Sequence, residues 1–277
     1  MSIENPQKPV VSWLTDIHLN FIGRSEAEGL CDAIRNSGSN TILITGDIAT
    51  AKNLCRHLDY LANNLKMQIY FVLGNHDFYH SSIKQVRKDV AKVIKTHKNL
   101  IWLSKAGVIE LTPESCLIGH EGFADGRLGN PERSTVMIND YFYIEELVQP
   151  TKELRLEVQH KLGDEAAAYI TKQLAKAVKR YKHIIVALHV PPFPEACWHE
   201  GNNTDDNFLP HFGCQATGDV LKATMLAHPE ITMTVYCGHG HSSGEAQILP
   251  NLRVITGGAE YRRPEITGMV NLDWREK

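Results

Sequence analysis

The sequence predicts an α/β fold with a parallel sheet in its N-terminal half, on three observations. Short runs of apolar and β-branched residues alternate three times with stretches of helical periodicity. Each run is too short for a helix, and a glycine or a polar residue follows it. Strands that alternate with helices in this way favour βαβ units, whose strands are parallel.

The elements are expected in the following order. Strands at Val10–Leu14, Thr41–Thr45 and Gln68–Leu73 alternate with helices at Ser25–Asn36, Asn53–Leu65 and Ser81–Thr96. Three short apolar runs then predict a meander, at Leu100–Leu103, Val108–Leu111 and Cys116–Ile118. Helical periodicity returns in two stretches, Ile138–Val148 and Lys152–Tyr181. Later strands are expected at His183–Leu188, Ile231–Tyr236, Ala246–Leu249, Leu252–Ile255 and Gly268–Leu272, with a helix at Ala216–Leu226.

Composition narrows the class of protein. The chain has 277 residues, 43% of them hydrophobic, and a formal net charge of −3 without long runs of one sign. Neither a nucleic-acid surface nor a membrane patch is therefore indicated. The N-terminus lacks the pattern of a signal peptide, and no apolar run reaches the ~20 residues that cross a bilayer, so we expect a cytoplasmic protein. The six cysteines are scattered, which predicts reduced thiols.

Polar side chains follow five of the predicted strands, at the point where each strand ends. They form the motifs Asp16-x-His18, Gly46-Asp47, Gly74-Asn75-His76-Asp77, His189 and Gly238-His239-Gly240-His241. If the strands are parallel, these side chains meet at one edge of the sheet. Carboxylate, amide and imidazole donors suit ions such as Mn, Fe, Zn or Co. Each motif alone is more often a turn or a helix cap, but five together favour a metal site.

The five motifs, in this order, resemble the calcineurin-like metallophosphoesterase family, and they span most of the chain from Asp16 to His241. The resemblance implies a four-layer αββα sandwich, in which two mixed β-sheets face each other and helices cover the outside. It also implies one domain over residues 1–277, with inserted loops and helices around 119–181 and 190–213. The activity implied is hydrolysis of a phosphomonoester or a phosphodiester by a hydroxide that bridges two metal ions.

The resemblance also implies a role for each residue of the motifs. The ions would be divalent or trivalent, with Mn, Fe or Zn expected. His76 would be the general acid beside the leaving group, Asp77 a structural support, and Gly74 the residue that lets the backbone turn. The metal ligands would be Asp16, His18 and His241 for the first ion, Asn75, His189 and His239 for the second, and Asp47 as the bridge.

One departure from the family pattern narrows the class of substrate. Protein serine/threonine phosphatases of this family carry G-D-x-V-D-R-G, whereas residues 46–52 read GDIATAK. The second carboxylate and the arginine are missing, which disfavours that subfamily. The low basicity favours a small phosphoester over a long nucleic acid, and no protein partner is evident. Three stretches are candidates for contact with the substrate: Asn20–Arg24, Gly119–Arg133 and Pro191–Gly213. For Arg127 and Arg133, a solvated or salt-bridged surface role stays an equal alternative to phosphate binding.

Two other functions stay open. A mononuclear metallohydrolase acting on a non-phosphate ester or an amide would use fewer ligands, and the shared position expected for Asp47 argues against it. A non-catalytic metal-binding module of the same fold would keep the ligands without turnover. No expected ligand and no catalytic histidine is missing from the sequence, which argues for an enzyme.

Overall fold

The first sheet is built from the strands of the N-terminal half. The computed structural model describes residues 9–273. The first sheet has the order β13-β1-β2-β3-β4, and its strands are parallel except β13, which runs antiparallel to β1. The strands are β1 (Val11–Leu14), β2 (Thr41–Thr45), β3 (Gln68–Val72), β4 (Leu100–Trp102) and β13 (Gly268–Met269). The predicted parallel βαβ arrangement is confirmed.

The second sheet has the order β11-β12-β10-β7-β6-β5, with four parallel strands between two antiparallel edges. Its strands are β5 (Ile109–Glu110), β6 (Ser115–His120), β7 (His183–Leu188), β10 (Thr232–Cys237), β11 (Gly244–Leu249) and β12 (Leu252–Thr256). A small hairpin, β8 (Trp198–His199) with β9 (Asn202–Asn203), lies in the long loop after β7. β6 and β7 are buried along their whole length, as expected for strands covered on both faces.

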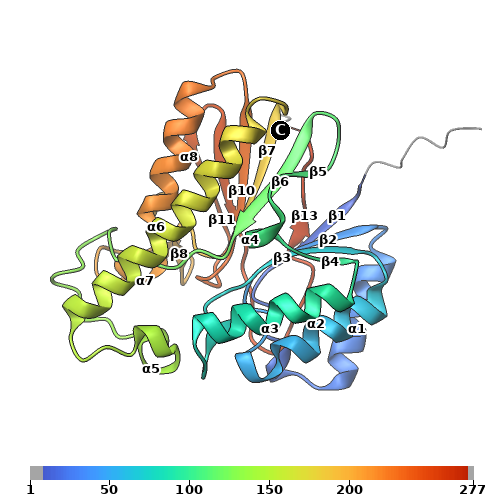
Figure 1. The fold of residues 1–277 in the computed structure, drawn as a ribbon, viewed down its shortest axis with the longest axis horizontal. Helices are drawn as coiled ribbons and strands as arrows, with labels where there is room; N and C mark the ends of the chain where they lie inside the picture. The colour runs from blue at the N-terminus through green and yellow to red at the C-terminus, as the bar shows by residue number, and fades with distance from the viewer. Residues whose placement is uncertain (1–8, 274–277) are drawn as a thin grey trace, which may run out of the picture.

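The two sheets pack face to face with helices outside, which confirms the predicted four-layer sandwich (Figure 1). The apolar layer between the sheets includes Trp13 and Tyr236, whose rings meet edge-to-face at 4.9 Å. α1 (Arg24–Asn36), α2 (Ala51–Leu65) and α3 (Ile83–Thr96) cover the first sheet, and α6 (Lys152–Ala177) and α8 (Gln215–Ala227) cover the second. No helix within residues 9–273 is long and apolar enough to cross a membrane.

The short elements are α4 (Leu103–Ala106), α5 (Asp140–Tyr143), α7 (Leu209–Phe212) and the 3₁₀ turns η1 (Leu19–Phe21), η2 (His76–Phe78), η3 (Glu145–Leu147) and η4 (Pro194–Ala196). Most of them lie in or beside the loops at the strand ends. The expected inserts are the segment that carries α5, η3 and α6 and the loop that carries β8, β9 and α7. That residues 1–277 form one domain stays a prediction.

Two expectations for the middle of the chain are wrong. The predicted meander is divided, because β4 pairs with β3 in the first sheet whereas β5 and β6 belong to the second. α4 and Gly107, which has a φ of 80°, carry the chain from one sheet to the other. The helix predicted at 138–148 is interrupted at Ile144, which has an extended backbone and bridges to Ser81.

Candidate metal centre

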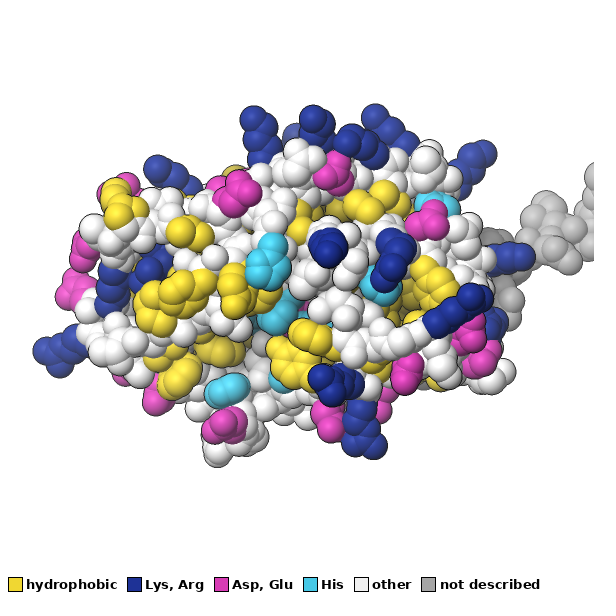
Figure 2. All heavy atoms as spheres, turned by 90° about the horizontal axis from the view of Figure 1, so that it is seen from below, with side chains coloured by type: hydrophobic (Ala, Val, Ile, Leu, Met, Phe, Trp, Pro, Cys, Tyr) yellow, Lys and Arg dark blue, Asp and Glu magenta, His cyan; other side chains and the backbone are white. Residues whose placement is uncertain are grey.

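The structure brings the predicted site residues together where the parallel strands of both sheets end. β1, β2 and β3 of the first sheet and β7 and β10 of the second lead into the loops that form the site. Figure 2 shows a face on which histidine side chains lie between hydrophobic patches. The loops carry, in chain order, Asp16, His18, Asp47, Asn75, His76, His189, His239 and His241.

The first group of ligand atoms comes from Asp16, His18, Asp47 and His241, and these atoms all lie within 4.8 Å of one another. His241 Nε2 is 3.1 Å from His18 Nε2 and 3.4 Å from Asp16 Oδ1. The Thr15 hydroxyl donates a hydrogen bond to Asp16 Oδ2 at 2.6 Å, and Asp16 Oδ1 faces His241. Two carboxylates and two imidazoles at this spacing fit a divalent cation of the Mn, Fe or Zn type.

A second group joins Asn75, His189 and His239. His189 Nδ1 is 2.8 Å from the carbonyl oxygen of Thr45, and His239 Nε2 is 3.2 Å from that of His211. Because a carbonyl oxygen only accepts, these two nitrogens carry the protons and the other nitrogen of each ring presents a lone pair. His189 Nε2 and His239 Nδ1 lie 2.9 and 3.0 Å from Asn75 Oδ1. Three acceptors that converge in this way fit a cation.

The amide of Asn75 is oriented by Asp140, a residue that the sequence analysis missed. Asn75 Nδ2 and the Tyr79 hydroxyl both donate to Asp140 Oδ1 at 2.7 Å. Because its nitrogen is engaged there, Asn75 turns its oxygen toward the histidines. Burial raises the pKa of Asp140, and the two hydrogen bonds act against that rise. Asp140 follows no strand, so no pattern in the sequence pointed to it.

Asp47 lies between the two groups. Its Oδ2 is 3.8 Å from His18 Nε2, and its Oδ1 is 3.4 Å from His189 Nε2. Burial and the charge of Asp16 raise the pKa of Asp47 well above its usual value. At Asp16 burial acts in the same direction, but a hydrogen bond from His241 and the nearby imidazole charges outweigh it and lower the pKa. A cation between the groups would stabilise both carboxylates in the ionised form.

His76 lies beside the ligand groups at the edge of the cleft. Its Nε2 is 3.8 Å from Asp47 Oδ2, and its ring stacks on Tyr79 at 4.2 Å. The side chains of His76 and His241 are 15% and 22% exposed, so substrate can reach both. Those of His18 and His189 are each 1% exposed. Burial and the imidazoles of His18 and His189 lower the pKa of His76 to about 2. Its ring is therefore neutral at pH 7 in the free protein.

The backbone of the loops is strained at five of these residues. A left-handed φ, rare for residues other than glycine, occurs at Asp16 (51°), His18 (40°), Asp47 (51°), His239 (76°) and His241 (55°). Each such residue costs roughly 1–3 kcal/mol, and strain of this kind clusters at functional sites. The clustering therefore marks this edge of the fold as a site, independently of the side-chain chemistry.

Gly74 makes the close approach of two loops possible. A Cβ atom at this position would lie 2.1 Å from Asp47 Oδ1 and 2.4 Å from Asp47 N. Space is the reason for a glycine here, because the φ of Gly74 is not left-handed. Asp77 joins the same loops, since its carboxylate accepts the N–H groups of Ala49 and Gly74, each at 2.8 Å. This is the supporting role predicted for Asp77.

A cleft of about 350 Å³ opens next to the ligand groups. One of the three predicted substrate stretches lines it, and a second packs on a residue of its wall. The loop at 191–213 supplies His199 and Phe212 to its wall, and Phe21 packs on Tyr261, which also lines it. Tyr261 was missed, although it follows the parallel strand β12, whose end lies at the same edge. That position was a signal available in the sequence.

The third stretch, 119–133, has structural contacts instead. Asp125 is buried and accepts the backbone N–H groups of Gln215 and Ala216 at the start of α8. Arg127 pairs with Asp125 at 3.1 Å and with Asp164 at 2.8 Å. The expectation that this stretch contacts substrate therefore finds no support, because its charged groups are engaged within the fold.

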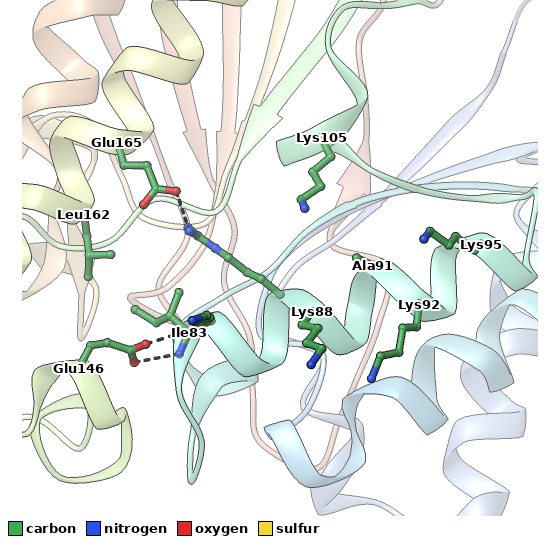
Figure 3. A pocket seen from close by; sticks show the side chains of 11 residues that line it. Ile83, Lys88, Ala91, Lys92, Lys95, Lys105, Glu146, Leu162 and Glu165 are labelled. Atoms are coloured by element: carbon green, nitrogen blue, oxygen red, sulfur yellow. Dashed lines mark hydrogen bonds and ion pairs between the residues drawn. The ribbon is translucent and has the colours of Figure 1, made fainter.

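A larger hollow, of about 670 Å³, lies along α3, away from the ligand groups (Figure 3). Basic residues of α3 and α4 line it, and Arg87 reaches across it to Glu165 of α6 at 2.6 Å. Among the described residues that line this hollow, none is a predicted site residue. The positive charge of this part of the surface is thus separate from the candidate metal centre.

Comparisons with known proteins agree with the architecture. The model of a family described as calcineurin-like phosphoesterase matches residues 11–243. The fold is similar to that of a phosphopantetheinyl hydrolase from Mycobacterium tuberculosis, with a TM-score of 0.69 and 15% identity over 96% of this chain and 97% of that one. It is also similar to a dimetal phosphatase from Danio rerio, with a TM-score of 0.57 and 14% identity over 94% and 88% of the two chains. No curated protein matches the sequence.

Proposed function

Because this chain belongs to the calcineurin-like phosphoesterase family, as its strand-end motifs predicted, we propose that it hydrolyses small phosphoesters at a two-metal centre. The observation that carries the proposal is the pair of ligand groups with Asp47 between them. Each group directs lone pairs or carboxylate oxygens to one point, and a single carboxylate faces both points. This is the arrangement that two neighbouring cations require.

The proposed ligand assignment follows from the two groups. The first ion would be held by Asp16, His18 and His241 and the second by Asn75, His189 and His239, with Asp47, which lies between the two groups, shared by both. When bound, two such ions activate a water molecule as the nucleophile and neutralise charge on the phosphoryl group. The protein fixes the ligands in advance, because backbone carbonyls set the tautomers of the second group and Asp140 sets the amide.

His76 is proposed to protonate the leaving alkoxide. It is partly exposed and, unlike His241, belongs to neither ligand group, and its stacking on Tyr79 fixes the plane of its ring. An anionic phosphoryl group beside the imidazole favours its protonated form, which raises the pKa from the low value of the free protein. Proton uptake by His76 would then accompany substrate binding.

The size of the cleft supports a small substrate. Its volume of about 350 Å³ lies at the lower end of the roughly 300–1,000 Å³ typical of small-molecule sites. A phosphoprotein phosphatase is disfavoured as before, because Thr50, Ala51 and Lys52 replace the residues that such enzymes use.

Metal replacement tests the proposal. The protein is stripped of metal, refilled with Mn²⁺, Zn²⁺ or Fe²⁺, and assayed on p-nitrophenyl phosphate and bis(p-nitrophenyl) phosphate, with Asp47→Asn as the control. We expect two ions per chain and turnover of at least one ester, which the control loses. Two ions without turnover would support the non-catalytic module, and one ion per chain would support the mononuclear hydrolase; either result contradicts the proposal.

A further inference from the structure

Exposed aromatic side chains gather around the candidate metal centre. Phe21 and Tyr261 are 45% and 46% exposed, and Phe142 and Tyr143 are 59% and 39% exposed. Phe21 follows β1, Tyr261 follows β12, and the other two belong to α5 beside Asp140. In Figure 2, hydrophobic side chains lie on both sides of the central histidines. Single exposed aromatics are ordinary, but a group of them around one cleft marks a binding surface.

Tyr261 and Phe21 form a pair that stands directly over the first ligand group. The ring centroid of Tyr261 is 4.7 Å from those of His18 and His241, and 6.4 Å from that of His76. Phe21 meets Tyr261 at 5.3 Å with an interplanar angle of 86°. The two rings therefore fix each other in an edge-to-face arrangement and keep about half of their surface accessible. An exposed aromatic surface results within reach of the phosphoryl position.

The cleft itself offers few charges. No lysine or arginine lies among the described residues that line it, and its one carboxylate, Asp140, is engaged by Asn75 and Tyr79. Its wall also carries Met137 and Phe212. The lysines of this part of the fold line the separate hollow along α3 instead (Figure 3). Beyond the phosphoryl group, the cleft is thus matched to an uncharged apolar group rather than to further phosphates or carboxylates.

From this geometry we infer that the substrate carries an uncharged aromatic ring near its phosphoester, and that Tyr261, supported by Phe21, stacks on this ring. The inference rests on the proposed phosphoesterase function and adds the chemical class of the group next to the phosphate. Tyr261 and Phe21 determine specificity in this account and take no part in the chemical step. Stacking on a fixed ring is favourable because little side-chain freedom is lost.

The test compares esters that differ only by a phenyl group. For a monoesterase these are 2-phenylethyl phosphate and ethyl phosphate, followed by phosphate release. For a diesterase they are ethyl 2-phenylethyl phosphate and diethyl phosphate, followed by release of ethanol. We expect kcat/KM to be about tenfold higher for the phenyl member of the pair, the size of effect that stacking plus ring burial provides. Tyr261→Leu and Phe21→Leu should each bring this ratio close to one.

Tyr60→Leu, a matched change on α2 outside the cleft, should keep the wild-type ratio. A merely structural role of Tyr261 would lower kcat/KM for both esters and leave their ratio unaltered, which would overturn the inference. Equal turnover of the two esters by the wild-type protein would overturn it too, while the phosphoesterase function would stand. Absence of turnover on every ester with two ions bound would overturn both.

Discussion

Replacing Gly74 by alanine tests whether the contact between the β2 and β3 loops controls the metal centre. The added Cβ would lie 2.1 Å from Asp47 Oδ1 and 2.4 Å from Asp47 N. The carboxylate cannot simply rotate away, because the second contact is to backbone. The β2 loop must therefore move by several tenths of an ångström or more, and Asp47 moves with it.

The magnitude follows from these contacts. Forcing a methyl group into a packed site costs about 1–3 kcal/mol. For 277 residues, ~0.6 kcal/mol/K of unfolding entropy converts that cost into a fall in Tm of about 2–5 °C. A shift of about 1 Å in a positioned group lowers the rate about 100-fold, so kcat/KM should fall by up to about this factor. Calorimetry, metal analysis and the p-nitrophenyl ester assay measure the three effects.

Gly29→Ala provides the control. Gly29 lies inside α1, and a Cβ there meets nothing within 4 Å. Alanine is favoured over glycine in a helix by about 0.5–1 kcal/mol, so this variant should be slightly more stable and fully active. If Gly74→Ala proved as stable and as active as Gly29→Ala, the account of the loop contact would be refuted.

Three further predictions concern a proton donor, a positioning residue and acid stability. His76→Asn should keep two ions per chain by metal analysis and lower kcat by about 10²–10⁴-fold; loss of metal would make His76 a ligand instead. Asp140→Ala frees the amide of Asn75, so the affinity for the second ion, measured by titration, should fall about 10–100-fold, and an unaltered affinity would contradict this. Burial and the Arg253 guanidinium lower the pKa of His183 to about 4. Below about pH 6.5 this ring is protonated in the unfolded chain but stays neutral in the folded protein. The free energy of unfolding therefore falls by about 3 kcal/mol as the pH drops from 6.5 to 4. Urea unfolding of the metal-free protein should show a smaller loss between pH 7 and 4.5 in His183→Gln, and equal losses would refute it.

Where the ligands lie in the chain explains why the sequence predicts so much of the site. Asp16, Asp47 and Asn75 each follow a buried strand within a few residues. A short apolar run followed by a polar residue therefore predicts both the strand and its polar end. Parallel pairing then brings the ends together without any further information. The same holds for His189 and for the histidines after β10.

The features that the sequence analysis missed depend on packing between distant segments. Asp140 reaches Asn75 only because Ile144 interrupts the expected helix and joins the segment to Ser81. The runs that became β4 and β5 carry no signal for which sheet they join, since both are short and equally apolar. Tyr261 is the exception, because its position after β12 was a signal available in the sequence.

The division of the ligands between the sheets has a mechanical consequence. Asp16, His18 and Asp47 come from the first sheet, whereas His189 and the two histidines after β10 come from the second. Under the proposed assignment, each ion fastens one sheet to the other at a single end of the sandwich. Metal binding would then stabilise the whole fold. The added free energy of unfolding would grow with the logarithm of the free metal concentration once this exceeds the dissociation constant. The metal concentration would therefore determine both the activity of the protein and the stability of the packing between its two sheets.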